Sequence, residues 1–421
     1  MVLAIAGTGR RREGKAFIRM VTIIILVLLV PLLLINLFFV AELVVGLPRG
    51  RQLEWRPPVG RTVIILPAHN EEQVIGRTLA ALATACGEEF GILVVADNCS
   101  DRTAEEARGF AVSVAERQDV QRRGKGHALA FAREWLRADP PASVIVLDAD
   151  CRTDRNSLRA LAGASQQLRG PAQAINLLEP ARSSGPLVQV SSFAFMIKNL
   201  VRQRGLQRLA GSVHLTGTGM ALPWALFDKA DLATSSIVED VRLGIELARG
   251  GAHPRLIAEA SVWSPHADQS HTLGQRSRWE GGYLALARTA APALIARGLA
   301  TVSLRFLVAG LDLMVPPLAL LAMVNVVGLT CAVILAAIGV TEWLPALLLG
   351  GIGVAAAIVL LLTWWREGRA FLSPAALVRL PLYPLWKLPM YLKLARSGAP
   401  KQWQRTERPG QTDDGALPPI A

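Results

Sequence analysis

Cysteine is scarce in this sequence. Only four cysteines occur among 421 residues, and no two of them are spaced as Cys-x-x-Cys. Disulfide-stapled secreted domains and structural zinc sites both rely on closely spaced cysteines, so neither is indicated here. We expect four free thiols, at Cys86, Cys99, Cys151 and Cys331.

Charged side chains are missing from three long stretches near the two ends of the chain. The sequence as a whole is 52% hydrophobic, with a mean hydropathy of +0.35. About 20 consecutive apolar residues suffice to cross a bilayer as a helix. The first stretch is too long for the apolar region of a cleaved signal peptide. We therefore predict transmembrane helices over residues 21–47, 313–340 and 343–365.

Acidic residues are outnumbered by basic ones, 33 to 45, which leaves a net charge of +12. Nucleic-acid binding is one reading of such a balance, but no nucleic-acid motif is present and the basic residues lie beside the apolar stretches. This arrangement favours contact with anionic membrane lipids. We expect a basic N-terminal segment over 1–20, an amphipathic interfacial segment over 371–408 and a disordered tail over 409–421.

The polar middle of the chain, residues 61–300, reads as an α/β domain. Short runs rich in β-branched residues alternate with helical segments, which predicts a mostly parallel sheet built from βαβ units. A further segment, 192–208, mixes apolar and basic residues and is interpreted either as a helix in the headgroup layer or as an ordinary domain helix. The predicted strands are 62–66, 92–96, 112–114 and 144–147, and the predicted helices are 72–86, 104–109 and 125–138.

Acidic residues follow the predicted strands or stand in a later cluster. Asp97 ends the second strand, Asp148 and Asp150 follow the fourth, and Glu239 precedes Asp240 further along the chain. Ligands of parallel sheets bind at the carboxyl ends of the strands. Two carboxylates near one point repel each other unless a cation intervenes, and hard oxygen ligands select Mg²⁺ or Mn²⁺. For an isolated Asp-x-Asp, however, a turn or a helix cap is the commoner explanation.

The motifs are more informative as an ordered set than singly. The set consists, in chain order, of Pro67 to Glu72, Asp97 to Thr103, Lys125-Gly126, Asp148 to Asp150, Glu239-Asp240 and the Gln-x-x-Arg-Trp element of Gln275 to Trp279. Over residues 61–283 this set resembles the membrane-bound inverting family 2 glycosyltransferases, the branch that includes cellulose, chitin and hyaluronan synthases. The resemblance implies a GT-A-like nucleotide-sugar domain flanked by transmembrane and interfacial helices.

The resemblance also implies roles for individual residues. Asp150 and Asp148 match the residues that hold the divalent cation, with Asp150 the direct ligand and Asp148 also at the donor. Asp240 matches the catalytic base, and its chemistry agrees because an inverting transfer needs one base for the acceptor hydroxyl. The positions that match donor-binding residues are Pro67, Ala68, Glu71, Asp97, Lys125, Asp148, Gln275, Arg278 and Trp279.

The acceptor side is implied by fewer positions. Glu239 and Trp279 match residues near the acceptor, and Gly217 and Thr218 lie in a Gly-rich loop that has a similar place in the family. Other readings stay open: Glu239 and Asp240 also suit the first turn of a helix, Trp279 also suits a membrane anchor, and the loop also suits an ordinary turn.

The expected function is metal-dependent, inverting transfer of a hexose or N-acetylhexosamine from a UDP-sugar to a saccharide or lipid-linked acceptor, as in exopolysaccharide synthesis. Three spans are few for a polysaccharide channel, so a homo-oligomer or a secretion partner would be needed. A single-addition lipid glycosyltransferase of the ceramide type is the alternative. A non-catalytic scaffold is disfavoured because the Asp-x-Asp and the base are both present. A transporter is disfavoured because three spans without inverted repeats do not match transporter folds.

Location follows from charge and substrate. Basic residues on the two sides of the first span nearly cancel as an orientation signal. The basic C-terminal segment and the need for a nucleotide sugar indicate a multi-pass protein of a bacterial-type inner membrane, with its catalytic domain in the cytosol.

Overall fold

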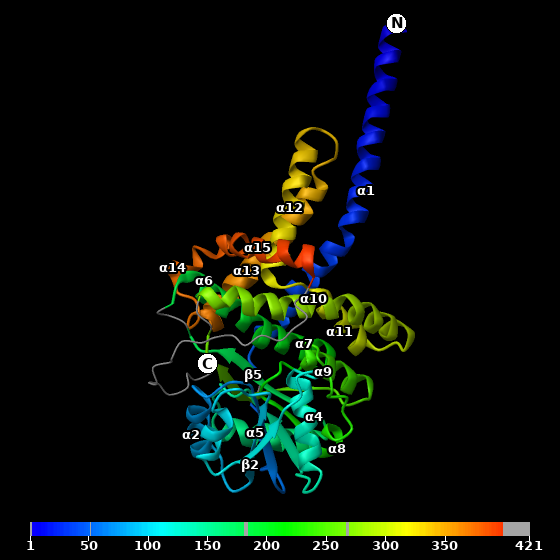
Figure 1. The fold of residues 1–421 in the computed structure, drawn as a ribbon. Helices are drawn as coiled ribbons and strands as arrows, with labels where there is room; N and C mark the ends of the chain where they lie inside the picture. Colours follow the sequence, from blue (N-terminus) through cyan, green and yellow to red (C-terminus); the bar gives the residue numbers. More distant parts are fainter. Residues whose placement is uncertain (1, 51, 181–183, 267–268, 399–421) are drawn as a thin grey trace.

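A mixed sheet of seven strands forms the centre of the domain in the computed structural model, which describes residues 2–50, 52–180, 184–266 and 269–398, and only the backbone of 2–13 and 269–271 (Figure 1). The strand order is β3-β2-β1-β4-β6-β5-β7; β6 runs antiparallel to β4 and β5, and the other neighbours are parallel. The strands are β1 (Thr62–Ala68), β2 (Phe90–Asp97), β3 (Ser113–Arg117), β4 (Ser143–Val146), β5 (Ala172–Leu178), β6 (Met220–Pro223) and β7 (Arg255–Ser264).

The predicted α/β class with a mostly parallel sheet is confirmed. Each of the four predicted strands has a counterpart, because β1, β2 and β4 are apolar runs buried on both faces, as parallel strands require. Strands β5, β6 and β7 have no counterpart among the predicted ones. The tail predicted over 409–421 and the end of the interfacial segment, 399–408, lie outside the described residues.

Helices cover both faces of the sheet, since successive strand residues point to opposite sides. On one face, α2 (Ile75–Ala85), α3 (Thr103–Arg108) and α5 (Arg155–Leu168) pack on the side chains that include Ile64 and Leu66. On the other, α4 (Lys125–Leu136), α8 (Trp224–Phe227) and α9 (Glu239–Arg249) pack on those that include Val63 and Ile65.

Helix α2 begins at Ile75, three residues after its predicted start at 72. The preceding amides are engaged elsewhere: the N–H of Glu71 donates to Thr103 Oγ1 (2.7 Å) and that of Glu72 to Asp101 Oδ2 (3.1 Å). These hydrogen bonds satisfy groups that a helix start leaves open, and they hold the loop after β1 beside the loop after β2.

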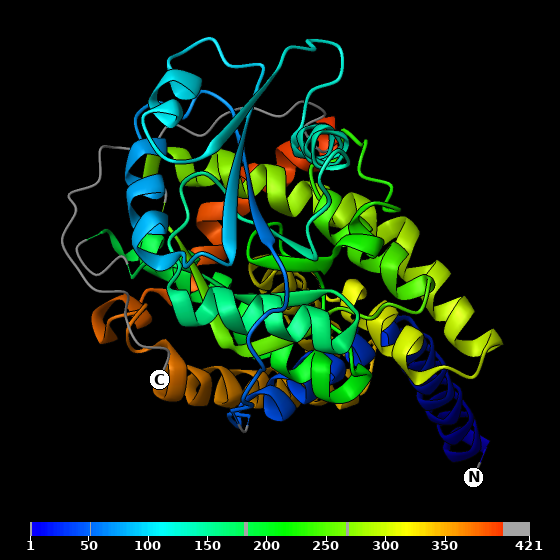
Figure 2. The same ribbon diagram turned by 90° about the horizontal axis from the view of Figure 1, so that it is seen from below.

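A third layer of helices separates the sheet from the helices that rise above it in Figure 1. It contains α6 (Pro186–Met196), a π-helical turn (Ile197–Arg202), α7 (Gln203–Ala210), α10 (Gln269–Ala300) and α11 (Leu304–Met314). Seen from below, α10, in yellow-green, crosses the domain from one side to the other (Figure 2).

The segment 192–208 lies inside this layer rather than in a headgroup layer. Phe193, Met196 and Leu200 are buried in one cluster with Ile175 of β5 and Phe39 of the N-terminal helix. The ordinary domain helix is therefore the correct reading of this segment. The interpretation as a membrane-surface helix is wrong because the apolar side chains of this segment are covered by β5 and by the N-terminal helix, and not by lipid.

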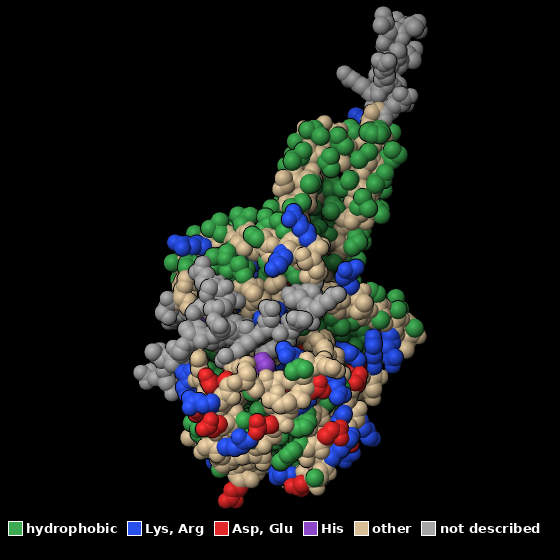
Figure 3. All heavy atoms as spheres, viewed as in Figure 1, with side chains coloured by type: hydrophobic (Ala, Val, Ile, Leu, Met, Phe, Trp, Pro, Cys, Tyr) green, Lys and Arg blue, Asp and Glu red, His purple; other side chains and the backbone are tan. Residues whose placement is uncertain are grey.

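Three described helices are long and apolar enough to cross a membrane, over residues 14–46, 318–337 and 344–368. They belong to α1 (Val2–Gly46), α12 (Leu318–Ala337) and α13 (Leu344–Thr363), which continues into a π-helical turn (Trp364–Gly368). On the face drawn in Figure 3 hydrophobic side chains cover these helices, and acidic ones appear on the domain below. Helix α12 begins at Leu318, not at 313, because Pro316 and Pro317 interrupt the chain after α11.

The N-terminal helix crosses α7 at two glycines. A Cβ on Gly205 would lie 2.1 Å from the carbonyl oxygen of Glu42, and one on Gly46 would lie 2.0 Å from that of Val201. Only glycine permits so close an approach of two helix backbones. The crossing fixes α1 to this third layer of helices.

The C-terminal part forms α14 (Pro374–Leu377), a 3₁₀ turn (Leu380–Leu382) and α15 (Tyr383–Ser397). Helix α15 buries polar side chains and exposes apolar ones, the reverse of the usual arrangement on a helix of a water-soluble domain. Tyr383 and Lys387 are buried, whereas Leu385 and Leu392 are exposed. Its apolar exposed side and its position beside α12 make it suited to the bilayer surface.

Candidate active site

The carboxyl ends of β1, β2 and β4 open into a cavity of about 400 Å³. Asp97, Asp150 and Asp240, which come from three separate segments, all line it. Every residue predicted for the donor, metal, base or acceptor also lines this cavity: Pro67, Ala68, Glu71, Lys125, Asp148, Gly217, Thr218, Glu239, Gln275, Arg278 and Trp279. The structure thus brings the predicted residues together, while the role of each remains a prediction.

Asp97 stands at the end of β2 and is fixed from two sides. Its Oδ1 accepts hydrogen bonds from Arg117 Nη1 (2.6 Å) and Asn98 Nδ2 (3.0 Å). Its backbone oxygen lies 2.7 Å from His69 Nδ1. Arg117 was not predicted, although it ends the neighbouring strand β3 and so stands at the same edge of the sheet. The outcome is a rigid carboxylate facing the cavity.

Asp148 is held by two partners after β4. Its N–H donates to Thr218 Oγ1 (3.1 Å), and its Oδ1 accepts from the Lys125 ammonium, which also donates to the carbonyl oxygen of Gly217 (2.7 Å). Burial tends to lower the pKa of Lys125, but the charges of Asp148, Glu239 and Asp240 outweigh it and raise the pKa. Lys125 therefore remains a cation among these carboxylates.

Asp148, Asp150 and Cys151 place ligand atoms within 4.8 Å of one another. Burial raises the pKa of the Cys151 thiol to about 12. The sulfur also lies 3.2 Å from Ser264 Oγ and accepts from Thr218 Oγ1 (3.3 Å). A protonated thiol in such contacts is a poor metal ligand. The two aspartates are left as a pair of hard oxygen donors, a set that fits Mg²⁺ or Mn²⁺.

Asp240 lies in the first turn of α9, directly after Glu239. Its Oδ1 accepts from the N–H of Val241 (2.8 Å). Burial raises the pKa of both carboxyls, that of Glu239 to about 8, and the neighbouring Asp240 contributes to the shift of Glu239. A carboxylate with a raised pKa is a stronger base. A position in the first turn of a helix and a role as a base are therefore compatible for Asp240.

Gly217 allows the Gly-rich loop to approach Asp240. Its φ is +83°, and a Cβ there would lie 3.2 Å from Asp240 Oδ2. A larger residue would be strained in the left-handed region and would crowd the carboxylate. The loop thus packs between Lys125 and Asp240.

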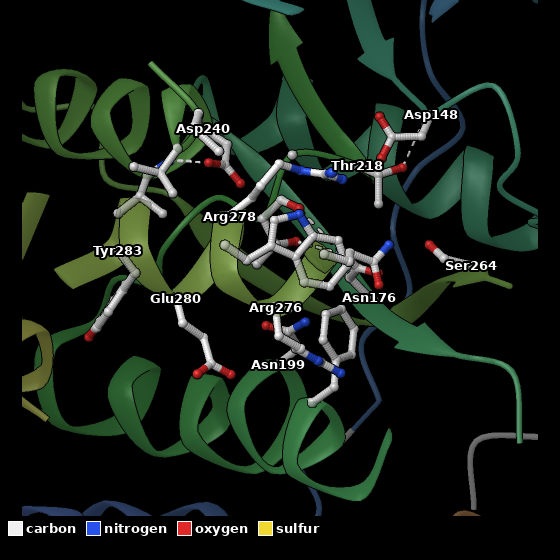
Figure 4. Close-up of a pocket in the computed structure, with 18 of the residues that line it drawn as sticks. Asp148, Asn176, Asn199, Thr218, Asp240, Ser264, Arg276, Arg278, Glu280 and Tyr283 are labelled. Atoms are coloured by element: carbon white, nitrogen blue, oxygen red, sulfur yellow. Dashed lines mark hydrogen bonds between the residues drawn. The ribbon is translucent and has the colours of Figure 1, made fainter. Parts of the chain in front are cut away.

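The Gln-x-x-Arg-Trp element lies on α10, with Gln275 buried and Arg278 half-buried. Trp279 packs beside Phe195 with ring centroids 5.7 Å apart. The guanidinium of Arg276 lies 5.3 Å from each of these two rings and donates to Ser191 Oγ (2.9 Å). In Figure 4, Asp240, Arg278 and Asp148 border a common space. Arg276 was not predicted, and it positions Trp279 through ring contacts that sequence spacing does not reveal.

The remaining lining lies toward the candidate membrane spans and was also not predicted. It includes Lys198 and Arg202 of the π-helical turn and residues of α1, α12 and α15. Arg202 pairs with Glu42 of α1 (2.6 Å) and with Asp312 of α11, whose other oxygen lies 2.6 Å from His214 Nε2. The only signal in the sequence was the presence of basic residues in the apolar segment 192–208.

Sequence comparison identifies the family. The profile of glycosyl transferase family 2 matches residues 63–172, and that of glycosyl transferase family group 2 matches residues 143–392, more than half of the chain. The chain belongs to glycosyl transferase family group 2. It is a glycosyltransferase, with the mostly parallel sheet and flanking helices described above.

Individual proteins resemble this glycosyltransferase more distantly. It is 26% identical over 238 residues to the probable glycosyltransferase YdaM of Bacillus subtilis (strain 168), an overlap of 52% of this chain and 54% of that protein. It thus spans about half the length of this curated relative.

Two solved structures are also similar. The mannosyltransferase PcManGT from Pyrobaculum calidifontis, in complex with GDP-Man and Mn²⁺, is 16% identical with a TM-score of 0.49, covering 78% of this chain and 94% of that one. Glucosyl-3-phosphoglycerate synthase from Mycobacterium tuberculosis, in complex with Mn²⁺, UDP and glucosyl-3-phosphoglycerate, is 17% identical with a TM-score of 0.37, covering 54% of this chain and 79% of that one.

Proposed function

We propose that this glycosyltransferase transfers a hexose or N-acetylhexosamine, with inversion, from a UDP-sugar to a hydroxyl group of a saccharide or lipid-linked acceptor at the membrane. The observation that carries the proposal is that Asp150, Asp240 and Arg278 border one cavity at the carboxyl ends of the strands. A cation, a diphosphate and an attacking hydroxyl can therefore be held within one enclosed space.

The transfer is a single displacement. Asp240 takes the proton of the acceptor hydroxyl as its oxygen bonds to the anomeric carbon, and the bond from that carbon to the diphosphate oxygen breaks. Asp150 and Asp148 would hold Mg²⁺ or Mn²⁺, which would supply positive charge for the leaving diphosphate. Arg278 offers a planar donor fork for phosphate oxygens, and Asp97 anchors the nucleoside at the far end.

The setting of the reaction follows from charge and from the helices. We place the catalytic domain in the cytosol, at a bacterial-type inner membrane crossed by α1, α12 and α13. Assignment to the cellulose, chitin and hyaluronan synthase branch is supported by the ordered motifs. Processive synthesis through a channel would need a homo-oligomer or a secretion partner, and single addition to a lipid would not.

The first experiment tests the reaction. Membranes that contain the protein are incubated with radiolabelled UDP-, GDP- and TDP-sugars, and both nucleotide release and product size are measured. We expect release from a UDP-sugar and its loss on Asp240→Asn, but not on Asp139→Asn, a change at an aspartate with an 83% exposed side chain. Equal activity of the wild type and Asp240→Asn would falsify the assignment of the base.

A further inference from the structure

The cavity does not end at the strands but continues to the membrane helices. Its lining includes Phe39 of α1, Leu318 and Ala319 of α12, and Tyr383 and Lys387 of α15. Leu318 and Ala319 form the first turn of a helix that continues as a candidate membrane span. The far end of the cavity is therefore at the level where that span enters the bilayer.

Helix α15 forms a wall between this end of the cavity and the lipid. Leu385 and Leu392 of this helix are 63% and 49% exposed, and Leu382 of the preceding 3₁₀ turn is 53% exposed, which gives an outward apolar side suited to lipid. On the inward side, the Lys387 ammonium pairs with Glu280, which also accepts from the Tyr391 hydroxyl (2.5 Å). Glu280 follows Trp279 on α10, so this wall is fastened directly beside the Gln-x-x-Arg-Trp element.

Lys198 is one of several cations that line this cavity. Lys125, Arg202 and Lys387 each form an ion pair with a carboxylate, and Arg276 is bound to Ser191 and two aromatic rings. Among the described residues Lys198 has no carboxylate within 4.0 Å; its Nζ lies 5.4 Å from the centroid of the Tyr283 ring.

The surroundings of Lys198 point to a ligand oxygen. Lys198 is an exposed residue that lines the cavity, as does Asp240, so its ammonium is accessible there to an oxygen of a bound ligand. An ammonium without a carboxylate partner keeps its three N–H donors for such an oxygen. It is carried by a π-helical turn, a local irregularity that often occurs at functional sites.

We propose that the acceptor is a membrane lipid whose headgroup hydroxyl reaches Asp240 from the bilayer side, past α12 and α15, and that Lys198 donates a hydrogen bond to a headgroup oxygen. This inference rests on the proposed function and narrows its acceptor. The hydrocarbon chains remain in the bilayer beside α12. One sugar is added to each headgroup, and the reaction needs no channel for a growing chain.

The acceptor is tested with the purified full-length protein in phosphatidylcholine vesicles. The vesicles contain phosphatidylglycerol, diacylglycerol or neither, and a parallel sample receives water-soluble oligosaccharides instead. Nucleotide release and label in the lipid extract are measured with the active donor. We expect labelled lipid from at least one hydroxyl-bearing lipid. Label in water-soluble products alone, or nucleotide release with no labelled lipid from either lipid, overturns the inference. Absence of nucleotide release from every donor would instead refute the proposed function.

The role of Lys198 is tested by Lys198→Met, with Lys198→Arg as the conservative variant. Loss of one charged hydrogen bond predicts a rise of about tenfold in KM for the lipid, larger than the fall in kcat. Lys198→Arg should recover part of the loss. The matched control Lys229→Met, at an exposed lysine of the domain, should resemble the wild type. An unchanged KM for the lipid, or a loss confined to kcat, overturns the role.

Discussion

The ammonium of Lys125 donates a hydrogen bond to the carbonyl oxygen of Gly217 over 2.7 Å and pairs with Asp148. Gly217 in turn packs against the carboxylate of Asp240. One lysine therefore joins the Asp-x-Asp, the Gly-rich loop and the proposed base. Removing its charge should alter both the cation site and the base.

Lys125→Met is expected to tighten Mn²⁺ binding and to slow transfer. The variant lacks a positive charge beside Asp148, which should strengthen cation binding by roughly 1–2 kcal/mol, or about tenfold. Sugar transfer should slow because the variant loses the hydrogen bond from Lys125 to Gly217, which positions the Gly-rich loop beside Asp240. Manganese affinity is read by electron paramagnetic resonance, and transfer by nucleotide release. Weaker Mn²⁺ binding in the variant contradicts this account of Lys125.

Glu239 predicts a pH-dependent stability. Its pKa is raised from 4.5 to about 8, first by burial and then by Asp240. The folded protein then keeps a proton that the unfolded chain releases, so this group lowers the free energy of unfolding as pH rises from about 4.5 to about 8. The melting temperatures are measured with a chelator present, so that no divalent cation is bound. Glu239→Gln should then melt at a higher temperature than the wild type near pH 9, and at a similar temperature near pH 5.

Glu105→Gln, at an exposed position, is the control for that series. It should show no gain that grows with pH. A melting difference for Glu239→Gln that is the same at both pH values would mean that Glu239 is not held protonated by its surroundings.

The pair of Lys387 and Glu280 predicts a strong coupling. Their side chains are only 2% and 12% exposed. Lys387→Met leaves a buried carboxylate and should cost about 3–5 kcal/mol of stability. The double variant with Glu280→Gln should recover most of this loss. Chemical denaturation of the wild type, both single variants and the double variant in detergent gives the coupling free energy of the pair. As a control, Arg102→Met, in an exposed pair with Glu106, should change stability by no more than about 0.5 kcal/mol.

The glycine crossing of α1 and α7 predicts a matched pair of variants. Gly205→Ala forces a Cβ against the backbone of Glu42 and should destabilise the protein by about 1–3 kcal/mol or more. Gly351→Ala, in α13, meets nothing within 4 Å and should be neutral or stabilising by up to about 1 kcal/mol. Equal melting temperatures of the two variants would show that the crossing is looser than described.

The strand-end carboxylates could be predicted because sequence alone marks where buried strands stop. Asp97 and Asp148 follow runs of β-branched residues, and parallel strands bring such positions to one edge. Predicting these two positions did not require knowledge of how distant parts of the chain pack together. The prediction that Asp150, in the turn after β4, lies in one site with Asp240, in the first turn of α9, depended on the resemblance rather than on any periodicity.

Strand β5 was missed for a physical reason. Gln173 and Asn176 interrupt its apolar run, although both are buried. Gln173 Oε1 accepts from the N–H of Thr216 (2.9 Å), and Asn176 Nδ2 donates to the carbonyl oxygen of Thr216 (3.3 Å). Gln173 and Asn176, which weaken the strand pattern in the sequence, hold the Gly-rich loop through these hydrogen bonds. Hydrogen bonds between residues so far apart in the sequence leave no local pattern that could predict them.

Of the two interpretations of the segment that contains Lys198 and Arg202, the membrane-surface one was wrong for a related reason. Basic residues on an apolar helix predict a membrane surface, but here they face an internal cavity and the buried acids Glu42 and Asp312. The partners lie on α1 and α11, more than a hundred residues away in either direction. Burial of that kind is decided by tertiary packing, which amphipathicity does not encode.

The most direct test compares two aspartates of the same cavity. Mn²⁺ binding and sugar transfer are measured for the wild type, Asp150→Asn and Asp240→Asn. We expect Asp150→Asn to lose both, and Asp240→Asn to bind Mn²⁺ normally while transfer falls by about 10²–10⁴-fold. Transfer that survives in Asp240→Asn, or Mn²⁺ binding that survives unchanged in Asp150→Asn, contradicts a site in which one carboxylate holds the cation and the other takes the proton.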